Sequence, residues 1–144
     1  MGIYLMVKKN LWDWMEILRD NSVEAIRDVT ERIRRLDHED KVQFIVLYGS
    51  LAEGRRGKLS DIDLAVGHEG NKKERFNFRL KTLGELDDKF DVQIFQDLPL
   101  YIKVEVLKGK VLYARNMKLL NEIALETLKE FEFFKPHFLD YIYR

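Results

Sequence analysis

The feature that most constrains the fold is a set of short apolar segments, the first of which ends at a glycine. Lys41–Tyr48, KVQFIVLY, is rich in branched and aromatic residues and lies between the polar DHED and Gly49, which predicts a buried strand. The segments Ile62–Val66 and FDVQIF, which starts at Phe90, predict two more strands. KVLYA, at 110–114, predicts a short edge strand. The chain therefore holds enough strands for one small sheet.

Helical periodicity fills most of the sequence between and around these strands. Ser22 is a suitable N-cap for a helix whose apolar residues recur at helical spacing, namely Val23, Ile26, Val29, Ile33 and Leu36. A second helix is predicted over 72–88, with Phe76, Leu80 and Leu83 facing inward. A third is predicted to start after Pro99, and a fourth to run from Asn116 to the end of the chain.

These elements predict an α/β (α+β) fold with a small mixed β-sheet of three to four strands flanked by helices. At 144 residues the chain has room for a single domain. We divide it into N-terminal helices (1–40), a catalytic core (41–114) and a C-terminal helical segment (115–144). The fold thus carries helical extensions at both ends.

Composition limits the kinds of partner. The 25 acidic and 25 basic residues balance, whereas a nucleic-acid binder usually carries a basic excess, so we expect no nucleic-acid substrate. No cysteine is present, which excludes thiol catalysis and zinc–thiolate sites. The first ten residues place their charges after a short apolar run, the reverse of a signal peptide, and no apolar run approaches the roughly 18 residues of a membrane span. We therefore expect a cytoplasmic protein with no membrane contact.

The stretch YGSLAEGRRGKLSDIDLAV, from Tyr48 to Val66, combines glycines with acidic residues in a pattern that suits phosphate chemistry. Gly49 and Ser50 follow the first strand directly, where glycine permits a tight turn and a close approach of the backbone to a ligand. A short helix starting near Ser50 would direct its free N–H groups at an anion, and the serine would add a hydroxyl donor.

Three aspartates follow on the predicted strands. Asp61 and Asp63 are two residues apart, so on a strand their side chains project from the same face, about 6–7 Å apart. Asp91 stands where a neighbouring strand starts. Adjacent like charges need compensation, which hard divalent cations supply. Three carboxylates beside a phosphate loop therefore predict two Mg²⁺ ions that clamp the attacking and leaving oxygens of a phosphoryl displacement.

A Gly-Ser pair, ten residues, an Asp-Ile-Asp triplet and a later aspartate on a strand together resemble the nucleotidyltransferase superfamily of DNA polymerase β. The short chain is similar to the minimal nucleotidyltransferases, in particular the MNT antitoxins that pair with HEPN-type toxins. The resemblance runs over about 42–114 and includes LKGKVLYAR after the third strand.

This resemblance implies a fold, a reaction and a partner. It implies that Gly49 and Ser50 hold the phosphates of ATP, that Asp61 and Asp63 bind Mg²⁺, and that Asp91 completes the metal site and helps to activate the attacking hydroxyl. It also implies transfer of AMP to a tyrosine hydroxyl of a partner HEPN-type toxin, which silences the toxin.

Two other functions fit the same residues. The chain could be a non-catalytic antitoxin module that acts by occlusion of its partner, or a small-molecule nucleotidyltransferase of the antibiotic-modifying kind, which would need a homo-oligomer to complete its acceptor pocket. The C-terminal segment LKEFEFFKPHFLDYIYR is rich in aromatic residues and suits either a partner surface or a helix that covers the core. Trp12 and Trp14 raise the same pair of alternatives.

Overall fold

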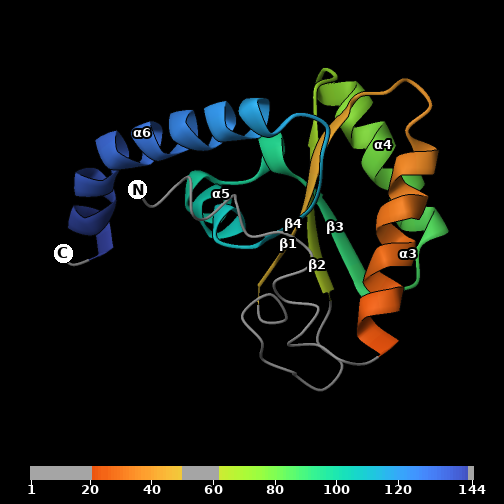
Figure 1. Cartoon of the computed structure of the whole chain (residues 1–144). Coiled ribbons are helices and arrows are strands. Elements are labelled where there is room, and N and C mark those ends of the chain that lie inside the picture. Colours follow the sequence, from red (N-terminus) through yellow and green to blue (C-terminus); the bar gives the residue numbers. More distant parts are fainter. Residues whose placement is uncertain (1–20, 50–61, 143–144) are drawn as a thin grey trace.

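The computed structural model of the protein describes residues 21–49 and 62–142, with the side chains of 21–22 and 137–142 excepted. Along the chain these residues form helices and strands in a mixed order (Figure 1). They are α3 (Asn21–Leu36), β1 (Val42–Tyr48), β2 (Ile62–His68), α4 (Lys72–Glu85), β3 (Phe90–Ile94), the 3-10 turn η1 (Phe95–Asp97), α5 (Leu100–Leu107), β4 (Lys110–Ala114) and α6 (Met117–Ile142).

The four strands form one mixed sheet in the order β3-β2-β1-β4, which confirms the predicted α+β class. β1 is antiparallel to both β2 and β4, whereas β2 and β3 are parallel. A parallel pair requires a crossover connection, and α4 supplies it. β4 lies at one edge of the sheet, as predicted, and β3 lies at the other.

Helices cover both faces of the sheet (Figure 1). α3 and α4 lie on one face, and α5 and α6 on the other. Alternate residues of each strand therefore enter two separate apolar clusters. Leu64 and Val66 of β2 pack in the cluster of α3 and α4, whereas Ala65 packs in the cluster of α5 and α6. Four of the five predicted stripe residues of α3 are buried, and the fifth, Leu36, is half-buried against the same cluster.

The predicted inward face of α4 is wrong for two of its three residues. Phe76 and Leu80 are 55% and 51% exposed, while Phe78 and Thr82 are buried, and Leu83 alone packs on the core as expected. Phe76 and Phe78 lie on different sides of this helix, so helical periodicity fits either side equally well as the inward face. Packing against the sheet decides between them, and Arg79 fixes the choice by donating from Nε to the carbonyl of Val92 at 2.8 Å.

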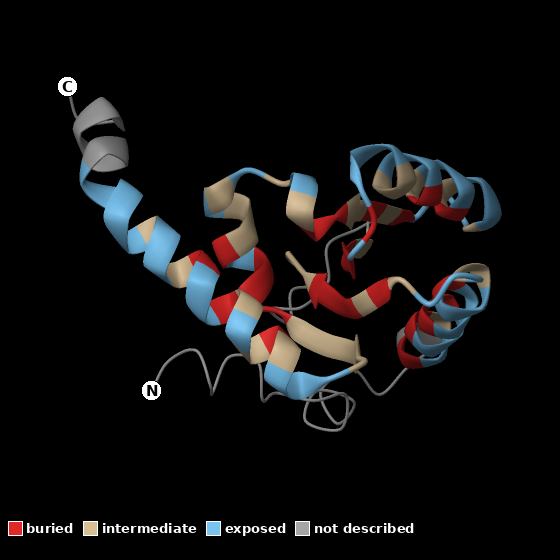
Figure 2. Cartoon of the chain, turned by 90° about the horizontal axis from the view of Figure 1, so that it is seen from above, coloured by how far each residue is buried: buried red, intermediate tan, exposed pale blue. Residues whose placement is uncertain are grey.

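α6 continues far beyond the part of the helix that packs on the core. Its buried residues, Leu120, Ala124 and Thr127, lie in its first half. In the described side chains beyond them, Figure 2 shows mostly exposed residues, and Phe133 is 82% exposed and Phe134 is 49% exposed. Among the described residues, no helix is both long and apolar enough to cross a membrane.

Candidate nucleotide site

The backbone at the end of β1 brings Gly49 against an acidic side chain of the next strand. Gly49 adopts φ +80°, a left-handed conformation that L side chains rarely adopt. A Cβ atom at this position would lie 2.5 Å from Oδ2 of Asp63. Glycine is therefore required here for two reasons, its dihedral angle and the space that the carboxylate occupies.

Three polar side chains form a row across the sheet at this end. Tyr48 of β1 is the register partner of Asp63 on β2, and Asp63 is the register partner of Asp91 on β3. Register partners project from the same face of a sheet. That face is the one covered by α5 and α6, because Tyr48 packs against their cluster and Ala65, two residues after Asp63, belongs to it. The fold thus brings together two predicted site residues from distant parts of the chain.

The row concentrates negative charge. Neighbouring strands lie about 4.8 Å apart, so the Asp63 and Asp91 carboxylates are close neighbours of like charge. Burial raises the pKa of the Tyr48 phenol to about 12, with further contributions from the charges of Asp63 and Asp91. Tyr48 is therefore a neutral hydroxyl at physiological pH. Hard carboxylate oxygens placed side by side are the donor type that Mg²⁺ prefers.

Gln93 is a member of this site that the sequence pattern did not single out. Its Nε2 donates to Oδ1 and Oδ2 of Asp91 at 3.3 and 3.4 Å. It stands two residues after Asp91 on β3, so both side chains project from the same face. Strand alternation alone could have identified Gln93, and pairing with β1 could have identified Tyr48, once the strand order was known.

Two predicted site residues, Ser50 and Asp61, lie outside the described residues. Within the described ranges, no group of three or more histidine, aspartate or glutamate side chains is arranged to hold a metal ion. A site with three carboxylates therefore depends on Asp61 and stays a prediction. The pair that the structure does bring together is Asp63 and Asp91.

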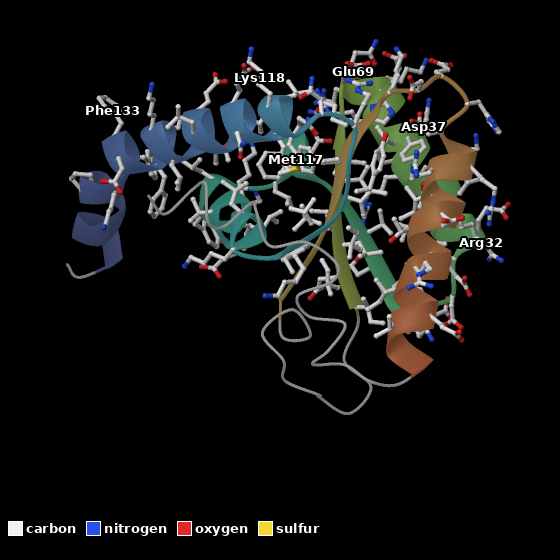
Figure 3. The ribbon with its side chains drawn as sticks, viewed as in Figure 1. Arg32, Asp37, Glu69, Met117, Lys118 and Phe133 are labelled. Atoms are coloured by element: carbon white, nitrogen blue, oxygen red, sulfur yellow. The ribbon has the colours of Figure 1, made fainter. Side chains whose placement is uncertain are left out.

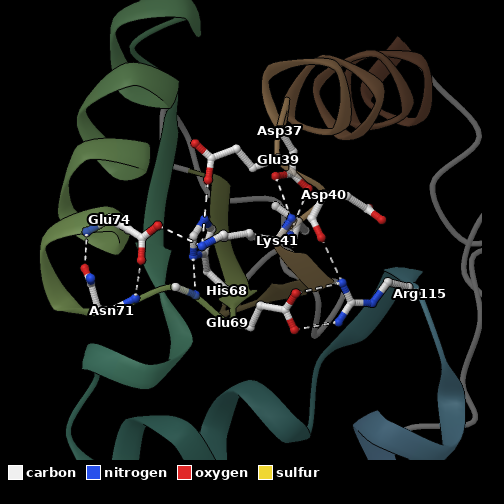
Figure 4. Close-up of polar contacts among 11 residues, drawn as sticks. Asp37, Glu39, Asp40, Lys41, His68, Glu69, Asn71, Glu74 and Arg115 are labelled. Carbon is white, nitrogen blue, oxygen red and sulfur yellow. Dashed lines mark hydrogen bonds and ion pairs between the residues drawn. The ribbon is translucent and has the colours of Figure 1, made fainter.

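Charged residues at the opposite end of the sheet are arranged differently (Figure 4). Asp37 accepts hydrogen bonds from the backbone N–H groups of Lys41 and Val42 at 2.9 and 2.8 Å. Lys41 Nζ lies 2.7 Å from Glu74 Oε2, and Arg115 contacts the Glu69 carboxylate at 3.0 Å. Figure 3 shows Asp37 and Glu69 at this end of the molecule, remote from the end where β1 meets Gly49.

A hollow of about 240 Å³ also lies at this opposite end and includes the buried His68 in its wall. The Nδ1 of His68 accepts a hydrogen bond from the N–H of Gly70 at 3.0 Å, and its ring packs on Phe78 at 5.0 Å between centroids. Burial lowers the pKa of His68. Asp37, Lys41 and Glu74, which share the wall, serve the structural contacts described above. We therefore place the candidate site at the carboxylate row.

Comparison with known families assigns the chain to one of them. Residues 31–118, more than half of the chain, match the family described as Polymerase beta, Nucleotidyltransferase. The chain belongs to this nucleotidyltransferase family. The match includes the whole sheet, and with it Gly49, Asp63 and Asp91.

One relative and several solved structures are similar to this nucleotidyltransferase. A Methanocaldococcus jannaschii protein, named as a candidate protein adenylyltransferase, is 43% identical over 81 residues, which are 55% of this chain and 62% of the relative. The match therefore spans less than two thirds of that relative. A chain from a toxin–antitoxin crystal structure with AMP-PNP aligns at TM-score 0.63 and 23% identity, over 81% of this chain and 94% of its own length.

A second structure contains a tri-AMPylated Shewanella oneidensis HEPN toxin in complex with an MNT antitoxin. One of its chains aligns at TM-score 0.59 and 21% identity, over 79% of this chain and 92% of its own length. At these low identities the structural matches show a shared fold. The family match is what assigns the chain to the nucleotidyltransferases.

Proposed function

We propose that this nucleotidyltransferase transfers AMP from ATP to a hydroxyl group of a partner protein, in a reaction that requires Mg²⁺. The observation that carries the proposal is the in-register pair Asp63 and Asp91, held beside Gly49 in a chain of this family. The relative named as a candidate protein adenylyltransferase supports a protein as acceptor.

The carboxylates suit a divalent cation because they supply hard oxygen donors from adjacent strands. Asp61, Asp63 and Asp91 would hold Mg²⁺, and two ions fit the three acids. Bound Mg²⁺ would neutralise charge on the triphosphate and on the leaving pyrophosphate. Gly49 and Ser50 would hold the phosphates, since the bare backbone of Gly49 leaves room for a close approach.

The transfer itself is a displacement at the α-phosphorus of ATP. The acceptor oxygen forms a bond to this phosphorus while the bond to the bridging oxygen of pyrophosphate breaks. Asp91 would receive the proton of the attacking hydroxyl, directly or through water. Tyr48 is neutral at physiological pH and would add no negative charge to the crowded row.

A HEPN-type toxin is the proposed partner, with a tyrosine as the acceptor and antitoxin action as the result. Support comes from the structural neighbours, one of which is a complex of an MNT antitoxin with a tri-AMPylated HEPN toxin. The exposed aromatic residues of α6 add a surface for such a partner, because α6 lies on the same face of the sheet as Asp63 and Asp91. Figure 3 shows Phe133 on the part of α6 that extends beyond α5.

The test is to incubate the protein with Mg²⁺ and ATP labelled at the α-phosphate, in extract from its source organism. We expect label on one discrete protein band with wild type and none with Asp63→Asn. Label from γ-labelled ATP alone would contradict nucleotidyl transfer. The labelled band, recovered and sequenced, identifies the acceptor and the modified residue.

Occlusion is the second candidate function, and the exposed Phe133 is the observation that favours it. The two functions separate in a neutralisation assay with the identified partner. Occlusion predicts that Asp63→Asn still neutralises the partner while Phe133→Ser does not. Transfer predicts that Asp63→Asn loses neutralisation even though it still binds.

A further inference from the structure

We propose that Gln93 is a positioning residue that holds the Asp91 carboxylate in the orientation required for metal binding and transfer. The inference rests on the proposed function and extends it to a residue outside the motif that defines the site.

The contact between the two side chains is a bifurcated hydrogen bond. Gln93 Nε2 lies 3.3 Å from Oδ1 and 3.4 Å from Oδ2 of Asp91, so one amide spans both carboxylate oxygens. Such a contact restrains the rotation of the carboxylate as well as its position. Both side chains are partly buried, so water screens the contact only in part.

Asp91 depends on this contact because of its place in the sheet. β3 is an edge strand, so Asp91 has a neighbouring strand on one side only, and the side chain across that strand pair is the like-charged Asp63. In the described part of the chain, Gln93 is the one residue that donates a hydrogen bond to Asp91. The Gln93 amide is therefore the described group that restrains the Asp91 carboxylate beside Asp63.

The chemistry of an amide suits this position better than that of a charged side chain. A lysine at 93 would compete with Mg²⁺ for the carboxylate, and a glutamate would accept rather than donate and add a further negative charge. The amide is a neutral donor, so it can orient Asp91 with or without a bound cation. The register partner of Gln93 is the buried Ala65, whose small side chain leaves space for the amide above β2.

The test compares three variants by metal binding and by kinetics. Gln93→Leu removes the donor. Gln93→Glu keeps the shape but replaces the donor by a negative charge. Gln43→Leu is the matched control. Gln43 also uses its side-chain amide, accepting from Gln96 Nε2 at 2.9 Å, but it stands at the opposite end of the sheet. Mn²⁺ binding is measured by electron paramagnetic resonance in the absence of nucleotide. The kcat and the KM for ATP are measured with the acceptor protein that the labelling experiment identifies.

For Gln93→Leu we expect Mn²⁺ affinity and kcat each to fall about tenfold, as is common for residues that orient a metal ligand, with KM for ATP almost unchanged. For Gln93→Glu we expect Mn²⁺ binding to be retained, because a carboxylate is added, and kcat to fall at least as far as in Gln93→Leu. Gln43→Leu should match wild type in both measurements.

Wild-type Mn²⁺ affinity and kcat in Gln93→Leu would overturn the inference, as would equal losses in Gln43→Leu, since these would indicate a general effect on the sheet. A wild-type protein that binds no Mn²⁺ would overturn the inference together with the metal site. A wild-type protein that binds Mn²⁺ but transfers no AMP would contradict the proposed function alone, and the Mn²⁺ affinities would then decide the role of Gln93.

Discussion

The two ends of the sheet handle charge in opposite ways. At the end where β2 finishes, Glu69 pairs with Arg115, Lys41 with Glu74, and Asp37 with backbone N–H groups. At the end where β2 starts, Asp63 and Asp91 are direct register partners of the same sign. Opposite charges in contact stabilise a fold, whereas like charges in contact oppose it. We therefore expect the paired end to serve the structure, and we propose the end with Asp63 and Asp91 as the place of the chemistry.

The support around the carboxylates leads to the same conclusion. Gly49 gives Asp63 space that any side chain would fill, and Gln93 holds Asp91. A fold selected for stability alone has no need of such an arrangement, since apolar residues in the same row would pack without repulsion. Substitutions at one end at a time test this contrast.

The largest effect is expected for Asp63→Asn, which removes one charge of the row. Transfer should fall by about 10³-fold or more, because a ligand of a catalytic metal supports several kcal/mol of charge stabilisation in the transition state. The fold should remain intact, since asparagine keeps the size and shape of the aspartate side chain. Transfer rates and circular dichroism check the two parts, and activity near the wild-type rate would contradict the carboxylate site.

Gly49→Ala should affect both stability and activity. The left-handed φ of +80° alone costs about 1–2 kcal/mol for an L residue, and the new Cβ would displace the Asp63 carboxylate. We expect a lower free energy of unfolding in denaturant titration and a loss of transfer.

Gly84→Ala is the matched control for this change. A Cβ at Gly84 meets nothing within 4 Å, and the residue lies in α4, so this variant should be more stable than wild type by up to about 1 kcal/mol and fully active. Equal losses in both variants would contradict the close approach of Gly49 to Asp63.

The paired end should show a pH dependence of stability through His68. Its pKa is lowered in the fold, first by burial and then by Lys41 and Arg75, against opposing contributions from Asp37 and Glu74. Protonation would also remove the acceptor of the Gly70 N–H. The unfolded chain therefore binds the proton more readily than the folded chain. The contribution of His68 to the free energy of unfolding is complete above the ordinary pKa of about 6.5 and decreases as the pH drops below it. The decrease is at most about 1.4 kcal/mol per pH unit.

Unfolding titrations at pH 7, 6 and 5 measure this slope, and His68→Gln should reduce it. The exposed His38 provides the control, because His38→Gln should have the same slope of unfolding free energy against pH as the wild-type protein. A slope that is the same in all three proteins would show that other groups account for it.

The smallest effect is expected for Glu69→Gln. The Arg115–Glu69 pair is partly exposed, with side chains 28% and 44% accessible, and such pairs contribute about 0.2–1 kcal/mol. The melting temperature should fall slightly and the transfer rate should stay at the wild-type value. A large loss of transfer from this variant would mean that the two ends are coupled, which would break the contrast between them.

Much of the fold could be predicted because its signals are local. The apolar runs of β1, β2 and β3, the stripe of α3 and the proline before α5 each identified an element, although β2 continues to His68, two residues beyond its predicted end. The inward face of α4 could not be predicted, because Phe76 and Phe78 offer two competing stripes. Only contact with the sheet distinguishes them.

The candidate site divides in the same way. The sequence by itself determined the types and spacing of the acidic residues and the glycine that turns the chain after β1. The tertiary structure decided that Asp91 lies beside Asp63, although 28 positions separate them, and that Tyr48 shares their face. The physical reason is that strand register is fixed by the packing of both sheet faces and by the crossover through α4, and no local segment contains that information.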